Sequence, residues 1–272
     1  MLTIQYASDK KPGAKHNEDL FGFKGDTFWL LDGATSTDGP PLARDAYWLV
    51  HELDTALNAL VSRDLDVSVL AAAACSLVGG QWSDTSELRP VAAMAVWRLR
   101  DGKLEAAVTG NVSLLVPSST GVLELTDTRI VPAYRGANDM LLQALANGLE
   151  FESIEFQQLR KAMKMQEAQA LAVSSTGWLA SAAHREPGDF CRFTVTDLAP
   201  RSMLAASDGF MELRRFWGCA DNAELLQSID ANPGGLREAL VQLRLFERLP
   251  DSGRQFPRTK RHDDATAVLI GL

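Results

Sequence analysis

Four short acidic clusters border apolar segments of the chain, and their side chains are the best candidates for chemistry. The clusters are His16-Asn17-Glu18-Asp19, Leu31-Asp32-Gly33-Ala34, Ser207-Asp208-Gly209-Phe210 and His262-Asp263-Asp264-Ala265-Thr266. Carboxylates that converge from such distant segments raise each other's pKa, because each charge disfavours the next. A divalent cation removes that cost, and magnesium, manganese and calcium prefer oxygen ligands. The sequence therefore predicts a metal site built from carboxylates.

The carboxylates lie where strands are expected to begin or end. Apolar runs precede Asp32 and Asp208, and another follows Asp263. A run of four to eight apolar residues bounded by polar ones is typical of a buried strand. If these strand ends lie at the same end of the fold, their carboxylate side chains lie close together.

The remaining pattern alternates short strands with amphipathic helices. The expected strands cover residues 2–7, 19–31 (with a turn at 24–26), 91–100, 104–109, 112–116, 122–125, 190–195, 203–207 and the end of the chain. The expected helices cover residues 42–60, 65–78, 137–169, 223–229 and 236–249, and a loop is expected over 250–262. Strands joined by short turns indicate antiparallel sheets, so the order predicts an α+β layered fold. Without a linker or repeat, residues 1–272 are expected to form a single domain.

The bulk composition narrows the class of protein. The net charge is −8, and without the six carboxylates of the four clusters it would be about −2. Nothing is basic enough for a nucleic-acid footprint, and no apolar stretch approaches the ~20 residues that cross a membrane. The three cysteines are odd in number and widely spaced, and the first residues lack a signal-peptide pattern. We therefore expect a cytoplasmic protein that contacts neither nucleic acid nor membrane.

Taken together, the four clusters resemble the motifs of a known family. Asn-Glu-Asp early, Asp-Gly after the second strand, Ser-Asp-Gly late and Asp-Asp-x-Thr in the last strand are similar to the metal-dependent protein serine/threonine phosphatases of the type 2C or PPM class. Residues 260–269 look especially like the closing segment of bacterial members. The resemblance covers nearly the whole chain. It implies a four-layer α-β-β-α sandwich, two antiparallel sheets flanked by helices, which agrees with the α+β pattern.

Carried over by position, the resemblance implies a site for two Mg²⁺ or Mn²⁺ ions. Asp32 would bridge both ions, while Glu18 and the Gly33 carbonyl would complete one coordination sphere. Asp208 and Asp263 would hold the second ion. Two such ions lower the pKa of a shared water to near neutrality and clamp the phosphoryl oxygens during in-line attack.

The implied function is hydrolysis of phosphoserine or phosphothreonine monoesters by a water that bridges the two ions. Asp19 would hydrogen-bond that water rather than an ion. The substrate would be a phosphoprotein or a small phosphomonoester. No covalent intermediate on the enzyme is required.

The residue that binds the substrate phosphate departs from the family pattern. Family members carry a basic residue, usually arginine, just ahead of Asn-Glu-Asp. Here Lys15 is the nearest candidate, one step off the usual spacing, and Lys11 and Lys10 are further options. A lysine would act as a point charge without the bidentate fork of arginine.

Two further motifs also depart from the family. The His-Gly-Gly run that follows Asp-Gly in the family is replaced by Ala34-Thr35-Ser36-Thr37. Either no side chain acts as general acid, or His16 or His262 takes that role; the alternative is that both histidines only make supporting hydrogen bonds. The Gly-Asp-Ser-Arg segment appears as Gly110-Asn111-Val112-Ser113, so a third metal site is expected to be weak or absent.

Three other interpretations of the acidic clusters are possible. The carboxylates could simply cap helices and turns, which explains each cluster but not all four together. A pseudophosphatase, with the same fold and a binding or regulatory role, is favoured by Asn111 and Ala34 and opposed by the five retained ligand positions. An HD-type phosphohydrolase would need His262-Asp263 on a helix among more histidines than the four present. Zinc, P-loop and serine-esterase signatures are not found.

Overall fold

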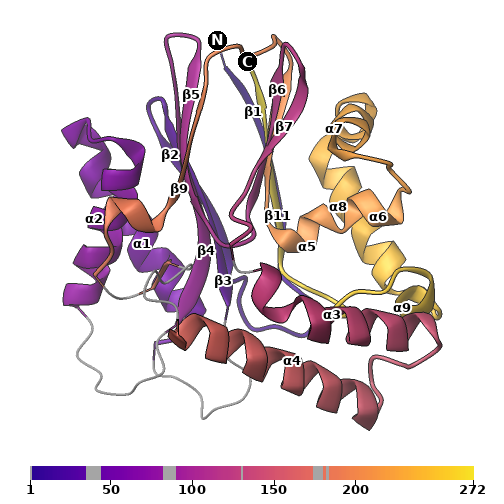
Figure 1. The fold of residues 1–272 in the computed structure, drawn as a ribbon. Helices are drawn as coiled ribbons and strands as arrows, with labels where there is room; N and C mark the ends of the chain where they lie inside the picture. The colour runs from indigo at the N-terminus through magenta and orange to yellow at the C-terminus, as the bar shows by residue number, and fades with distance from the viewer. Residues whose placement is uncertain (1, 35–43, 82–89, 130, 174–179, 182–183) are drawn as a thin grey trace.

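Two antiparallel sheets face each other, and helices cover the outer face of each (Figure 1). The computed structural model describes residues 2–34, 44–81, 90–129, 131–173, 180–181 and 184–272. The expected four-layer α-β-β-α sandwich is confirmed. Both chain ends lie at one end of the sandwich, away from α3 and α4.

The first sheet contains the last strand of the chain in its interior. Its order is β1 (Thr3–Asp9), β11 (Ala265–Gly271), β10 (Ser202–Ala206), β6 (Ser113–Ser118) and β7 (Gly121–Leu125). β11 pairs with β1 from Thr3 opposite Gly271 to Asp9 opposite Ala265. It is buried along almost its whole length, as expected for an apolar strand between two neighbours.

The second sheet contains two hairpins, β2–β3 and β4–β5. Its order is β2 (Asp19–Lys24), β3 (Thr27–Ala34), β4 (Val91–Arg100), β5 (Lys103–Thr109) and β9 (Cys191–Val195), with the short β8 (Ala180–Ser181) on β4. Tight turns join β2 to β3 and β4 to β5, with Gly25 at φ +63° between β2 and β3. Asp101 and Gly102 both have positive φ between β4 and β5, the geometry of a type I′ hairpin turn.

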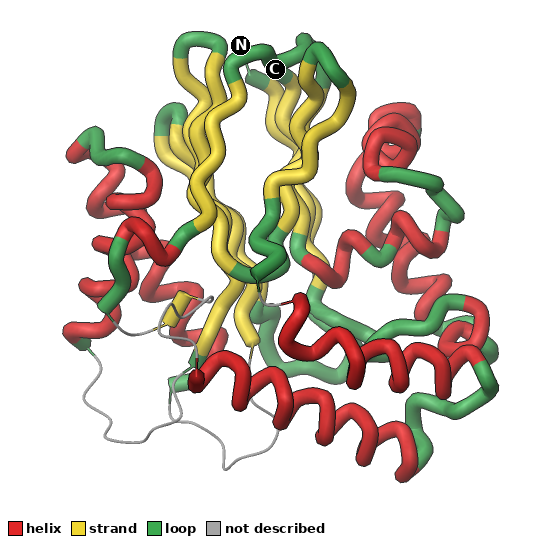
Figure 2. The backbone as a smooth tube through the Cα atoms, viewed as in Figure 1, coloured by secondary structure: helices red, strands yellow, loops and turns green. Residues whose placement is uncertain are grey.

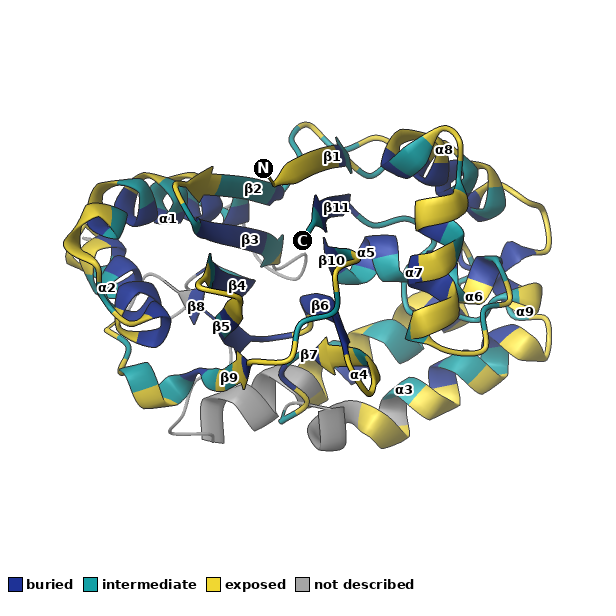
Figure 3. Cartoon of the chain, turned by 90° about the horizontal axis from the view of Figure 1, so that it is seen from above, coloured by how far each residue is buried: buried dark blue, intermediate teal, exposed yellow. Residues whose placement is uncertain are grey.

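A buried layer fills the space between the sheets. Phe28 of β3 stacks on Trp97 of β4 with ring centroids 5.7 Å apart, and Val268 and Ile270 of β11 pack in the same cluster. Because side chains alternate along a strand, the other faces of these strands pack against helices. Figure 3 shows buried residues concentrated on the inner strands such as β3, β4, β6 and β11, whereas much of β1, β7 and the outer helix surfaces is exposed.

Two helix pairs cover the outer faces of the sheets. α1 (Ala46–Leu60) and α2 (Val67–Gly80) lie on the β2–β3–β4 sheet, and their N-cap residues Asp45 and Asp66 accept backbone hydrogen bonds. The pair α7 (Asn222–Ala231) and α8 (Gly235–Glu247) covers the other sheet. The expected first helix began at Leu42, which lies outside the described residues.

The helical stretch expected over 137–169 forms two helices rather than one. α3 (Val131–Ala146) and α4 (Ile154–Val173) are separated by Gly148 at φ +99°, a left-handed conformation that ends a helix. They lie across one end of the sandwich (Figure 2) and share a small core that includes Leu145 and Phe156.

Short helical turns were missed by the sequence prediction. They are η1 (Val61–Arg63), η2 (Pro187–Asp189), α5 (Asp208–Met211), α6 (Leu213–Phe216) and α9 (Ser252–Gln255). One turn is too short to show a hydrophobic period. In the described part of the chain, no helix has the length and apolar character needed to span a membrane.

Candidate active site

The four acidic clusters meet at the end of the sandwich where α3 and α5 lie (Figure 1). Asp19 begins β2, and Asp32 stands directly opposite it near the end of β3. Asp208 follows β10 as the first residue of α5, and Asp263 comes two residues before β11. Both sheets therefore contribute carboxylates to one region, as the sequence predicts.

The glycines of the two Asp-Gly motifs allow this convergence. A Cβ atom on Gly33 would lie 2.8 Å from the Glu18 carbonyl oxygen, which accepts a hydrogen bond from the Gly33 backbone N–H at 3.0 Å. A Cβ atom on Gly209 would lie only 2.0 Å from the Asp264 carbonyl oxygen. Each glycine thus lets one acidic segment contact the backbone of another, which a larger residue would prevent.

Two buried side chains hold the segments together. The Asp264 carboxylate accepts hydrogen bonds from the backbone N–H groups of Lys11, at 2.7 Å, and Glu18, at 3.3 Å. The Ser207 hydroxyl donates to Asp19 Oδ2 at 2.8 Å across the two sheets. The first acidic cluster is therefore tied to both late clusters through hydrogen bonds.

Burial and mutual repulsion make these carboxylates hard to ionise. Burial, together with the charges of Asp264 and Asp263, raises the pKa of Asp19 to about 7, although a hydrogen bond from Ser207 acts in the opposite direction. Burial also raises the pKa of Asp32 well above its ordinary value, and the charges of Asp19, Asp208 and Asp263 add to the effect. The pKa of Asp208 is raised as well, by burial and by Asp263. The four side chains are close enough to feel one another's charge.

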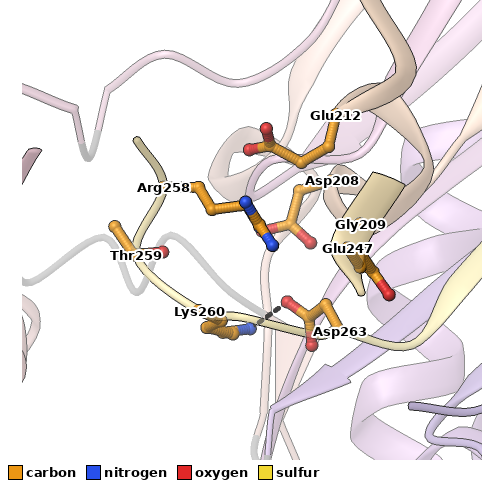
Figure 4. A pocket seen from close by; sticks show the side chains of 8 residues that line it. All are labelled: Asp208, Gly209, Glu212, Glu247, Arg258, Thr259, Lys260 and Asp263. Carbon is orange, nitrogen blue, oxygen red and sulfur yellow. Dashed lines mark hydrogen bonds and ion pairs between the residues drawn. The ribbon is translucent and has the colours of Figure 1, made fainter. Parts of the chain in front are cut away.

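Two side chains, Lys260 and Asn111, supply donors on the Asp208–Asp263 side of the cluster. The Lys260 ammonium forms an ion pair with Asp263 Oδ2, and Asn111 Nδ2 donates to Asp208 Oδ2 at 2.6 Å. Lys260, Asp208 and Asp263 line the same pocket (Figure 4). Burial alone would lower the pKa of Lys260, but the carboxylates of Asp263, Asp208 and Asp32 raise it. Lys260 is therefore a charged ammonium beside these carboxylates.

The Asp19 side of the cluster is less well satisfied. Asp19 Oδ1 is buried and has no hydrogen-bond partner among the described residues. A buried carboxylate oxygen without a donor is costly. This oxygen is therefore open to a donor or cation beyond those that the described residues provide.

The lysines ahead of the first cluster differ in their placement. Lys11 Nζ lies 3.5 Å from Glu18 Oε2 and 3.4 Å from Asp264 Oδ2. Lys15, the sequence-predicted phosphate ligand, is exposed, and its carbonyl oxygen accepts a hydrogen bond from Lys10 Nζ at 3.3 Å. The geometry thus brings Lys11 to the carboxylates.

The two histidine candidates contact other groups. His16 stacks on Tyr47 of α1 with centroids 4.3 Å apart. His262 Nδ1 lies 2.7 Å from Glu247 Oε2, and Glu247 also accepts from Arg244 at 2.9 Å. These contacts agree with a supporting role for His262. The residues after Ala34, where the family has His-Gly-Gly, lie outside the described residues.

The cluster has the oxygen ligands that a dication site needs, but its side chains are not arranged around one common position. Its donors are carboxylate and carbonyl oxygens, which hard dications prefer, and the open Asp19 oxygen fits a cation-centred site. Nevertheless, no three Asp, Glu, His or Cys side chains in the described ranges are arranged to hold a metal ion as they stand. Ligation of an ion by Asp32, Asp208 and Asp263 would require their side chains to move closer together.

Sequence reasoning assigned no individual role to three contributors to this site. Ser207, Asp264 and Lys260 all lie within or next to the clusters that the sequence singled out. The adjacency of Asp264 to Asp263 and the position of Lys260 three residues before Asp263 were available signals. What the sequence could not show is the direction of each side chain.

Solved structures with the same fold come from bacterial phosphatases. Over all of this chain and 98% of the other, the chain is similar to the serine/threonine phosphatase PstP/Ppp of Mycobacterium tuberculosis, with a TM-score of 0.55 at 12% identity. It is also similar to the PPM Ser-Thr phosphatase MsPP of Mycobacterium smegmatis in complex with cacodylate, with a TM-score of 0.56 at 16% identity over 99% of this chain and 98% of the other.

One neighbour was solved with metal. This is the catalytic domain of PstP in complex with two manganese ions, with a TM-score of 0.53 at 12% identity over 100% of this chain and 99% of that one. No protein-family model and no curated protein sequence matches the chain. At these identities the likeness concerns the fold: the chain has the fold of the PPM-type serine/threonine phosphatases.

Proposed function

We propose that this protein is a phosphomonoester hydrolase that uses two Mg²⁺ or Mn²⁺ ions and acts on phosphoserine or phosphothreonine. One observation carries the proposal: carboxylates from four distant segments gather at one end of the sandwich, and the pKa values of Asp19, Asp32 and Asp208 are raised there. Such a cluster is stable when ionised only beside cations. The fold shared with bacterial phosphatases supports the same function.

Each side chain of the cluster would have a role that follows from its position. Glu18, Asp32 and the Gly33 carbonyl would hold one ion, and Asp32, Asp208 and Asp263 the other. Bound there, the two ions would supply an activated water and neutralise charge on the phosphoryl oxygens. Asp19 would orient that water, because its buried Oδ1 has no hydrogen-bond partner among the described residues.

A lysine would bind the substrate phosphate. Lys15 is the candidate from sequence spacing, and Lys11 is the candidate from geometry because its ammonium already lies against Glu18 and Asp264. His16 remains a predicted general acid.

Hydrolysis of p-nitrophenyl phosphate and of a phosphothreonine peptide in the presence of MnCl₂ tests the proposal. We expect turnover that stops with EDTA and that falls by roughly 10²-fold or more in Asp32→Asn, because a central electrostatic group is lost. Circular dichroism of the variant controls for folding. Activity that persists in EDTA, or in folded Asp32→Asn, would contradict the proposal.

A pseudophosphatase is the second candidate, and one observation favours it. Lys260 and Asn111 already satisfy Asp263 and Asp208, so the chain partly neutralises its own site. Under this candidate the protein folds fully and binds partners without turnover. Absence of Mn²⁺-dependent hydrolysis by correctly folded protein would favour it over the enzyme.

A further inference from the structure

Lys260 lies beside two of the carboxylates proposed above to hold the second ion. It precedes Asp263 by three residues on the segment that leads into β11, and its side chain bends back to pair with the Asp263 carboxylate (Figure 4). The pair is partly buried, with side-chain exposures of 32% for Lys260 and 19% for Asp263. Partial burial strengthens an ion pair relative to one in water.

The neighbouring carboxylates also face this ammonium. Asp208 lines the same pocket as Lys260 and Asp263. The close packing of Gly209 on the Asp264 backbone keeps Asp208 and Asp263 adjacent. The positive charge of Lys260 therefore reaches the pair of carboxylates assigned above to the second dication.

We propose that Lys260 is a tethered cation that occupies the position beside Asp263, so that this carboxylate ligates a dication only after the ammonium has moved away. This inference rests on the proposed two-ion function. It makes the two ion positions unequal. At the position near Glu18 and Asp32, Lys11 Nζ comes only within 3.5 Å of Glu18 Oε2, whereas Asp263, at the position shared with Asp208, is paired directly with Lys260.

The consequence is a competition between an internal and an external cation. When a ligand binds only the fraction of molecules that are competent, its apparent affinity falls by that fraction. If Lys260 pairs with Asp263 in about nine of ten molecules, the apparent Kd of the second ion rises about tenfold. The same pairing stabilises the metal-free protein, because it compensates a charge that would otherwise be buried without a partner.

Isothermal titration with MnCl₂ and thermal unfolding in EDTA test the inference without an activity assay. We expect wild type to bind one ion tightly and a second weakly. In Lys260→Gln, the weak Kd should fall by about tenfold, and the melting temperature in EDTA should drop. Lys103→Gln is the matched control: it removes the same charge at the β4–β5 turn, far along the strands from Asp32, and should leave both Kd values unchanged.

A second variant covers the case in which Lys260→Gln folds poorly. Lys260→Arg keeps the charge and pairs with a carboxylate at least as well, so its second Mn²⁺ should bind as weakly as in wild type or more weakly. Tighter second binding in Lys260→Arg would overturn the inference, as would wild-type or weaker binding in folded Lys260→Gln. If wild type and Lys260→Gln both bind no Mn²⁺, the inference and the proposed function fall together. If wild type binds two Mn²⁺ ions and Lys260→Gln binds both with unchanged affinities, the inference fails while the proposed function stands.

Discussion

At the level of single residues, the negative charge of the clustered carboxylates is partly compensated by a few hydrogen-bond donors and ammonium groups of the same chain. Asp263 has Lys260, Asp208 has Asn111, and Asp19 has the Ser207 hydroxyl on one oxygen only. Lys11 neutralises the Glu18 and Asp264 side. Each of these contacts depends on one side chain, so a single substitution can test what that contact contributes.

The choice between Lys11 and Lys15 is the first such test. Because Lys11 is already oriented by Glu18 and Asp264, we expect Lys11→Gln to raise the KM for a phosphopeptide by about tenfold, the value of one lost charge contact of roughly 1.4 kcal/mol. Lys15→Gln, the matched substitution four residues away, should change KM less than twofold. Steady-state kinetics with MnCl₂ measures both. The reverse order would restore Lys15 as the phosphate ligand.

At the scale of elements, strand ends and two glycines position the site. Strand β3 delivers Asp32 opposite Asp19, and the turn after β10 delivers Asp208. Gly33 and Gly209 then allow backbones to touch that would otherwise be kept apart by a side chain. The geometry of the site thus depends on residues that carry no chemistry.

Gly209 provides the test at this scale. In Gly209→Ala the new Cβ would overlap the Asp264 carbonyl oxygen, and we expect a loss of about 1–3 kcal/mol in the free energy of unfolding. Gly136→Ala on α3 is the control, because its Cβ would meet no atom within 4 Å. Helix propensity predicts that this control gains up to about 1 kcal/mol. Urea unfolding measures both, and an unchanged Gly209→Ala would refute the close-contact explanation.

Sequence reasoning succeeded where a repeating pattern or a motif was present. Apolar alternation located the long strands, and the order of four acidic clusters indicated one site and the α-β-β-α fold. It failed at the break between α3 and α4, where Gly148 interrupts an otherwise helical stretch. It also missed Lys260, because the reach of a long side chain toward a carboxylate depends on the path of the backbone and leaves no spacing pattern. Whether residues 1–272 form a single domain stays a prediction.

For the molecule as a whole, repulsion among the clustered carboxylates makes the free energy of unfolding depend on pH. The pKa of Asp19 is about 7 in the folded protein, and that of Asp32 is also raised, whereas both are near 4 when unfolded. Between these values the folded state holds more protons, so the stability of the metal-free protein falls as pH rises. Dication binding removes the repulsion and displaces the protons held by these carboxyl groups. The affinity for metal therefore increases as the pH rises through the same range.

A pH series checks this directly. In EDTA, we expect the free energy of unfolding to fall by on the order of a few kcal/mol between pH 5 and pH 8. Asp19→Asn should flatten part of that slope, since it removes one of the two raised carboxyl groups. A metal-free protein that becomes more stable toward pH 8, or an Asp19→Asn profile that is as steep as wild type, would contradict the assignment.

The central claim is that carboxylates gathered from four segments repel one another until dications neutralise them. Thermal unfolding of wild type and Asp32→Asn at pH 8, each in EDTA and in MnCl₂, tests it most directly. We predict that Asp32→Asn melts a few degrees above wild type in EDTA, about 1–2 kcal/mol of relieved repulsion. It should also lose the Mn²⁺-induced rise, which in wild type reaches about 2.7 kcal/mol at a hundred times Kd. An Asp32→Asn protein that melts below wild type in EDTA, and is still stabilised by Mn²⁺ to the same extent, would contradict the account.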